Sequence, residues 1–82
     1  MPERLISLAH ARIIAGTLPA ALPAQTFGGI SEGKACGLCS GPIDPGAMEI
    51  ETYSRGVPIF YFHPTCFAEW TAAVRNGLAE HA

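Results

Sequence analysis

The chain has 82 residues, of which 49% are hydrophobic, and its formal net charge is −2. This composition excludes a disordered chain, and the scattered basic residues of an acidic chain disfavour nucleic-acid binding. No apolar run approaches the roughly 20 residues of a membrane span. Because His10 and Arg12 interrupt the apolar N-terminal stretch, this stretch is not typical of a signal peptide. We therefore expect a cytoplasmic protein with no membrane association.

We expect a single domain over residues 1–82, in which residues 1–35 supply an N-terminal helix and a packed irregular segment. The helix is predicted over residues 3–15, with Gly16 as its stop signal. Six apolar side chains form its broad face: Leu5, Ile6, Leu8, Ala9, Ile13 and Ile14. This face either packs on the rest of the domain or serves as a surface for dimerisation or for a partner protein.

Residues 17–35 carry two Leu-Pro steps and then a glycine-rich stretch, so a long helix or strand is not expected there. The segment is too apolar for a free linker. We expect four side chains to anchor it to the core: Leu18, Leu22, Phe27 and Ile30. The alternative for Phe27, with the two glycines after it, is an exposed recognition loop.

From Cys36 onward the sequence predicts a module over residues 36–80 that consists of a knuckle, a β-hairpin and a helix. Small residues surround the thiols of the segment 36–41, which favours a tight turn with backbone N–H groups directed at the sulfur atoms. Residues 47–53 alternate in polarity, with Met48, Ile50 and Thr52 on the expected core face and Glu49, Glu51 and Tyr53 on the other. Residues 57–62 return as a second strand, and Pro58 indicates that this strand either lies at a sheet edge or starts after the proline.

The last predicted element is a helix that begins at Pro64. Its apolar stripe is expected to pack on the hairpin and consists of Phe67, Trp70, Thr71, Val74 and Leu78. Asn76 and Gly77 are expected to weaken or end the helix. Glu69 is interpreted as a solvated side chain of the helix surface rather than as a general base.

Four residues carry the chemistry of the sequence, as a C-x-x-C pair at Cys36 and Cys39 and an H-x-x-C pair at His63 and Cys66. They include all three cysteines, which cannot all form internal disulfides. Three thiolates and one imidazole form a closed tetrahedral set that suits one structural Zn²⁺ and leaves no position for a substrate. The alternative, a C-x-x-C redox pair, is disfavoured because Pro42 opposes the helix that such a pair usually opens.

The order of knuckle, hairpin and helix, with the second ligand pair at the helix start, is that of a treble-clef zinc finger. The segment CGLCSGPIDPGAMEIETYSRGVPIFYFHPTCFAEW resembles such fingers with a Cys-Cys-His-Cys ligand set. It is similar to the N-terminal fingers of poly(ADP-ribose) polymerases and to the first zinc half of a LIM domain. The resemblance covers less than half of the chain and implies an α+β fold with Cys36, Cys39, His63 and Cys66 as ligands.

The chain departs from both families. A LIM domain continues with a second ligand set, and no such set follows Cys66. The polymerase fingers bind DNA breaks with basic residues, whereas this hairpin carries Glu49 and Glu51. The N-terminal part and the C-x-x-C and H-x-x-C pairs also look like a group of small uncharacterised bacterial proteins.

We therefore expect a small structural-zinc protein that acts as a protein-interaction or regulatory module, and not an enzyme. The partner would bind Tyr53, Arg55 and Phe60, or the N-terminal helix. A nucleic-acid-binding finger is one alternative. A redox sensor is another, in which oxidation of Cys36 and Cys39 ejects the zinc ion.

Overall fold

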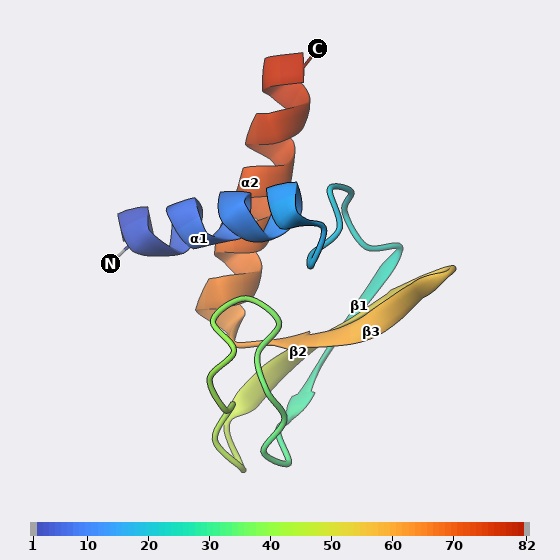
Figure 1. Cartoon of the computed structure of the whole chain (residues 1–82). Coiled ribbons are helices and arrows are strands. Elements are labelled where there is room, and N and C mark those ends of the chain that lie inside the picture. Colours follow the sequence, from blue (N-terminus) through green and yellow to red (C-terminus); the bar gives the residue numbers. More distant parts are fainter. Residues whose placement is uncertain (1, 82) are drawn as a thin grey trace.

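The computed structural model describes residues 2–81 and the side chains of residues 8–77. The chain folds in the order α1 (Pro2–Ala15), β1 (Gln25–Ile30), β2 (Met48–Ser54), β3 (Val57–Phe62) and α2 (Pro64–His81). The strands form one antiparallel sheet in the order β1-β2-β3, and α1 lies across α2 (Figure 1). This α+β arrangement is consistent with a small treble-clef-like domain.

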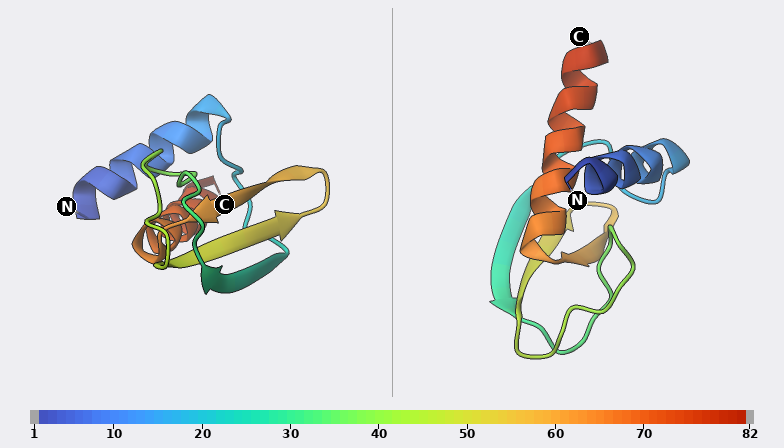
Figure 2. Two further views of the ribbon diagram at one scale, coloured as in Figure 1. Left: turned by 90° about the horizontal axis from the view of Figure 1, so that it is seen from below. Right: turned by 90° about the vertical axis from the view of Figure 1, so that its left-hand side faces the viewer.

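The strand β1 is the main departure from the sequence prediction, which treated residues 17–35 as irregular. Residues 25–30 pair with β2 at six consecutive positions, from Gln25 opposite Tyr53 to Ile30 opposite Met48. The hydrogen bonds of this long-range pairing, rather than local strand propensity, hold the segment extended. β1 forms one open edge of the sheet, as the two views of Figure 2 show.

Only one of the four predicted anchors of this segment is in the core. Leu18 is buried, whereas Leu22, Phe27 and Ile30 are 43%, 51% and 68% exposed. Phe27 packs edge-on against the ring of Tyr53, with centroids 5.3 Å apart. The prediction was wrong for these three side chains because strand pairing, not side-chain burial, fixes the segment.

The hairpin of β2 and β3 is confirmed, with two corrections to the faces of β2. Thr52 is buried and Ile50 is half-buried, as expected, but Met48 is 59% exposed because it pairs with Ile30 at the end of the sheet. Glu49, expected in solvent, is only 7% exposed, and its Oε1 atom has no hydrogen-bond partner. An unpaired buried carboxylate oxygen costs stability. Pro58 is accommodated because β3 is an edge strand.

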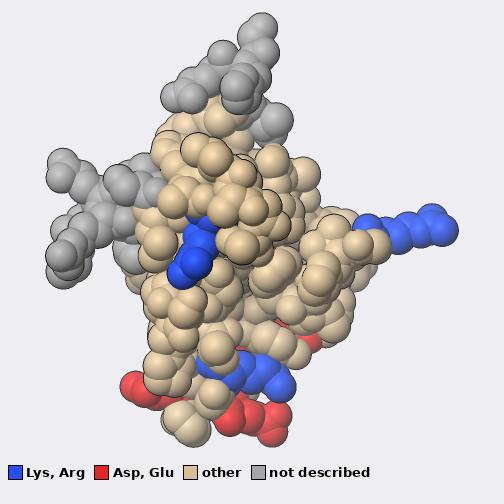
Figure 3. Space-filling model, in the orientation of Figure 1, with Lys and Arg blue, Asp and Glu red and all other residues tan. Residues whose placement is uncertain are grey.

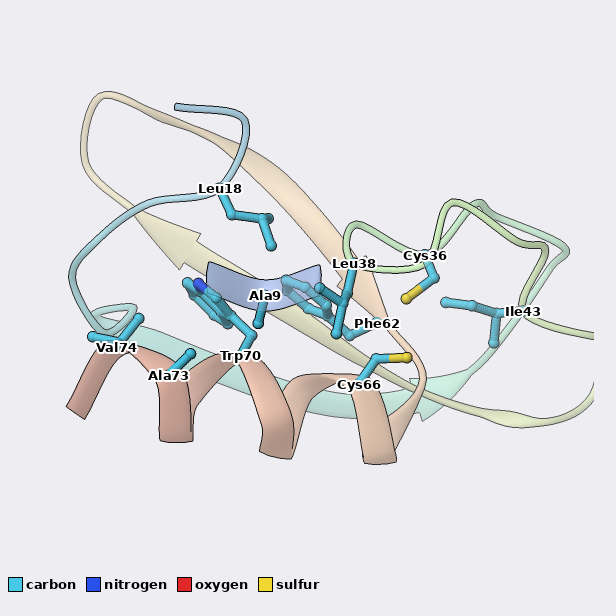
Figure 4. Packing of buried hydrophobic residues seen from close by; sticks show 10 residues of the cluster. All are labelled: Ala9, Leu18, Cys36, Leu38, Ile43, Phe62, Cys66, Trp70, Ala73 and Val74. Carbon is cyan, nitrogen blue, oxygen red and sulfur yellow. The ribbon is translucent and has the colours of Figure 1, made fainter. Parts of the chain in front are cut away.

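The core lies where the two helices, the knuckle and the inner face of β3 meet. The ring of Trp70 is stacked on that of Phe62, with centroids 5.0 Å apart and an interplanar angle of 11°. Phe67 contacts both rings edge-on. The buried apolar residues, drawn in Figure 4, are Ala9, Leu18, Cys36, Leu38, Ile43, Phe62, Cys66, Trp70, Ala73 and Val74.

Both predicted helices are present. α1 ends as expected at Gly16, which has a positive φ of 81°. α2 does not end at Asn76 and Gly77 but continues to His81, so an end of the helix at these residues was wrong. A single glycine within a helix costs only about 1 kcal/mol, which the packing of a long helix can offset. The side chains of Leu5, Ile6 and Leu78 lie outside the described residues. No helix of the described chain has the length and apolarity to cross a bilayer.

Candidate metal centre

The first ligand pair lies on a tight turn between β1 and β2. The amide of Cys36 donates to the carbonyl of Gly41 at 2.8 Å, and the amide of Ser40 donates to the carbonyl of Cys36 at 3.0 Å. Ser40 adopts a left-handed conformation with φ of 65° to complete the turn. The turn thus curls Cys36 and Cys39 towards one point, as the small residues of the knuckle predicted.

The second ligand pair spans the junction of β3 and α2. His63 follows the last residue of β3, and Cys66 lies in the first turn of α2, where the amide of Phe67 donates to the carbonyl of His63 at 2.9 Å. The knuckle is tied to β3 because the amide of Gly37 donates to the carbonyl of Tyr61 at 2.7 Å. A Cβ atom at Gly37 would lie 3.2 Å from the rings of Phe60 and Phe62, so this close approach favours glycine.

These elements bring all four predicted ligands together. Their candidate ligand atoms all lie within 4.8 Å of one another, and Nδ1 of His63 is 3.5 Å from the sulfur of Cys39 and 3.7 Å from that of Cys66. Tetrahedral zinc with ordinary bond lengths separates a nitrogen and a sulfur ligand by about 3.6 Å. The spacing therefore fits one zinc ion. Figure 4 shows the sulfur atoms of Cys36 and Cys66 turned towards one another beside Leu38 and Phe62.

The tautomer of His63 is set by a backbone contact. Its Nε2–H group donates to the carbonyl of Pro42 at 3.2 Å. The neutral ring consequently presents the lone pair of Nδ1 to the sulfur atoms. A metal-binding histidine commonly has its second nitrogen fixed in this way. The contact was not predicted from the sequence, because Pro42 is 21 positions away and nothing in the local pattern marks its carbonyl.

The pKa values of two thiols in the cluster, Cys36 and Cys66, are shifted in opposite directions. Burial acts to raise the pKa of Cys36, but hydrogen bonds from the backbone of Cys39, His63 and Leu38 outweigh it and lower the pKa from 9.0 to about 7. Burial and the neighbouring Cys36 and Cys39 raise the pKa of Cys66 to about 12. The protein alone therefore favours one thiolate and opposes a second. A divalent cation would remove this repulsion, which is the behaviour expected of a cluster that could bind a single zinc ion.

We expect zinc affinity to rise with pH, because binding displaces the thiol protons. At any pH below about 12 the Cys66 thiol must lose its proton, so each unit of lower pH should weaken binding by at least about tenfold. Below about pH 7 the Cys36 thiol is also protonated, and the dependence should steepen to at least about a hundredfold per unit. Chelator competition between pH 6 and 8.5 measures this slope. A pH-independent affinity would contradict the thiolate assignment.

One contact at the centre was missed by the sequence reasoning, which treated Arg12 as an isolated basic residue. Its Nε–H group donates to the carbonyl of Leu38 at 3.1 Å, and its Nη2 group donates to Oγ of Ser40 at 3.1 Å. These acceptors are 26 and 28 positions away along the chain. Local periodicity carries no signal for such a pairing.

Comparison of the chain with protein-family models, with curated proteins and with solved structures gives no match. Within the described part of the chain, Cys36, Cys39, His63 and Cys66 are the group of histidine, cysteine and acidic side chains placed to hold a metal ion. Together they support a small zinc-binding module.

Proposed function

We propose that the protein is a structural-zinc module that binds an extended segment of another protein along β1. The observation that carries the proposal is the state of this strand. All six residues of β1 are exposed, the strand carries no charge and no proline, and it pairs with β2 without a bulge. Such an unprotected edge offers free backbone N–H and C=O groups to a further strand.

The metal centre supports a structural rather than a catalytic role. Four protein ligands complete a tetrahedral zinc site, whereas a catalytic site usually keeps one position for water or substrate. Cys36 and Cys66 are buried, and Cys39 and His63 are half-buried. We therefore propose that the ion holds the knuckle, β3 and α2 together and that the protein is not an enzyme.

The chemistry of β1 indicates what its partner would be like. Exposed apolar side chains accompany the edge, at Leu22 before the strand, at Phe27 and Ile30 within it, and at Met48 opposite Ile30. A segment that pairs with β1 and carries β-branched or aromatic side chains would cover them. With no charge along the strand, the partner segment should itself be largely uncharged.

A second copy of this chain is a less suitable occupant. Two β1 strands paired with each other would join only six residues from each chain. A stable interface commonly involves about 20–30 residues a side. A longer segment of a different protein can continue past the ends of β1, and we therefore commit to that partner.

The docking residues predicted from the sequence belong to the hairpin of β2 and β3 and not to β1. Tyr53 contacts Phe27 and donates a hydrogen bond to Glu51. Phe60 pairs with Thr52 on the face of the sheet opposite to Tyr53, and its ring lies against that of Phe62. Arg55 is exposed at the turn between β2 and β3. In the present proposal Phe27 replaces Phe60 beside Tyr53.

The two alternative functions find less support. The basic side chains on the face shown in Figure 3 stand apart from one another, which is unlike the basic stripe of a nucleic-acid-binding surface. A redox sensor would need oxidant to reach Cys36 and Cys39 together, and Cys36 is only 2% exposed. The open edge of β1 therefore favours protein binding over nucleic-acid binding and redox sensing.

The proposal is tested with a displayed library of random ten-residue peptides selected on the zinc-loaded protein. Selected peptides should carry β-branched or aromatic side chains on both faces of the strand that they form, because Phe27 and Ile30 are three positions apart and lie on opposite faces of β1. The variant Phe27→Lys/Ile30→Lys should weaken their binding at least about tenfold, since lost anchors are worth on the order of 1–2 kcal/mol each. Both side chains are exposed, so the variant should keep its fold.

The matched control is Ile14→Lys, which places the same charge at an 86% exposed position of α1. Binding that responds to this control, and not to the strand variant, would transfer the docking site to α1. A selection that yields no binding peptide would refute the proposal. Tight, salt-dependent binding of an oligonucleotide would favour the nucleic-acid alternative instead.

A further inference from the structure

Arg12 links α1 to the metal centre. It lies in the last turn of the helix, and its guanidinium is half-buried against the knuckle. Its two acceptors, the carbonyl of Leu38 and the hydroxyl of Ser40, belong to the residues on either side of Cys39. A single side chain from outside residues 36–80 therefore fixes the backbone around a metal ligand.

The contact with Leu38 extends to a second ligand. The carbonyl of Leu38 and the amide N–H of Cys39 belong to the same peptide group. Arg12 donates to the carbonyl oxygen of this peptide group. The amide N–H of the same group, which belongs to Cys39, donates to the sulfur of Cys36. Because hydrogen bonds in a chain polarise one another, the guanidinium strengthens the donor that faces the sulfur.

The charge of the guanidinium also suits the centre. Three thiolates, one neutral imidazole and one Zn²⁺ leave one net negative charge. Arg12 supplies a positive charge that does not titrate, because a guanidinium stays protonated. Its planar fork can donate to the carbonyl and to the hydroxyl at once, whereas a lysine offers only a point contact.

We propose that Arg12 is an outer-shell positioning residue of the metal centre, which orients the knuckle through the Leu38–Cys39 peptide and makes docking of α1 and metal loading depend on each other. The inference rests on the proposed zinc binding. By linkage, the factor by which a docked α1 strengthens metal binding equals the factor by which the metal strengthens docking of α1.

The test compares Arg12→Gln with Arg75→Gln, which makes the same charge change at an exposed arginine of α2. Zinc affinity is measured by chelator competition with the full chain. Arg12→Gln should bind zinc about 10–100-fold more weakly, as is typical when an outer-shell partner is lost. Arg75→Gln should match the wild type. Arg12→Lys should fall between them, because it keeps the charge without the fork.

A second readout separates positioning from general loosening of the fold. The control is Ala9→Gly, which weakens α1 at a buried position and leaves Arg12 in place. With Co²⁺ in place of zinc, Arg12→Gln should move the sulfur-to-cobalt charge-transfer band to longer wavelength, because a thiolate with a weaker hydrogen bond is easier to oxidise. Ala9→Gly should lower the melting temperature and leave the band in position.

The outcomes are distinct. A wild-type chain that binds no metal would overturn the proposed function and this inference with it. A wild-type chain that binds zinc, with Arg12→Gln equal to Arg75→Gln, would overturn only the inference. Equal loss of affinity in Arg12→Gln and Ala9→Gly, with an unmoved band in both, would also overturn it by reducing Arg12 to a packing role. A shifted band confined to the Arg12 variants supports it.

Discussion

Replacement of Cys66 by serine is expected to abolish zinc binding and cooperative folding together. The side chain is buried in the first turn of α2, and its ligand atom belongs to the four-residue cluster. A domain of this length is stable by about 4–12 kcal/mol, whereas structural zinc contributes on the order of 10–16 kcal/mol in small domains. Loss of one ligand should therefore lower the free energy of unfolding by more than its whole value, so the chain should not fold. Cys39→Ser should behave in the same way.

The measurement is native mass spectrometry together with thermal unfolding followed by near-ultraviolet circular dichroism. The wild type should carry one zinc ion and lose its melting transition in a strong chelator. Thr65→Ser is the control, because it alters the exposed neighbour of Cys66 and no ligand. A Cys66→Ser protein that keeps the wild-type melting temperature would refute a structural role for the metal.

Replacement of Trp70 by alanine is expected to be the most damaging change in the apolar core. Trp70 is 1% exposed, stacks on Phe62 and contacts Phe67 edge-on. Its Nε1–H group also donates to the carbonyl of Pro19 at 3.1 Å, which ties the segment after α1 to α2. Truncation of a buried tryptophan typically costs about 3–5 kcal/mol, a large part of the stability of this chain.

Urea unfolding at saturating zinc measures this cost. The comparison variant is Trp70→Phe, which keeps an aromatic ring against Phe62 and removes the donor to Pro19. We expect it to lose on the order of 1–2 kcal/mol, because it gives up one hydrogen bond and some packing. The assignment of Trp70 to the centre of the core would fail if Trp70→Ala stayed within about 1 kcal/mol of the wild type.

The metal ligands could be found from the sequence because their pattern is local. Each pair needs only the chain between its members, two residues in each case, to bring two side chains to one point. The hairpin between the pairs brings His63 and Cys66 back to the knuckle, and its alternation is also a local signal. The same reasoning identified Phe67 and Trp70 of α2, which pack against Phe62 of the hairpin.

The strand β1 and the burial of Glu49 could not be found in this way. A segment with two central glycines has weak strand propensity, and it is extended only because β2 is there to pair with it. Exposure of Phe27, Ile30 and Met48 likewise depends on the position of β1 at the edge of the sheet and of Met48 opposite Ile30 at its end. No window of neighbouring residues contains that information.

The sequence by itself determined the two helices, the hairpin of β2 and β3, the four candidate ligands and the kind of metal they suit. These follow from side-chain chemistry and from short spacings that any folded form of the chain must respect. The tertiary structure decided that β1 is an open edge, that Pro42 sets the tautomer of His63, and that Arg12 reaches the knuckle from α1. These contacts join residues 21 to 28 positions apart, or depend on which strand ends at the rim of the sheet. Only the packing of the whole chain fixes such pairings, because each is one of many that the local sequence would equally allow.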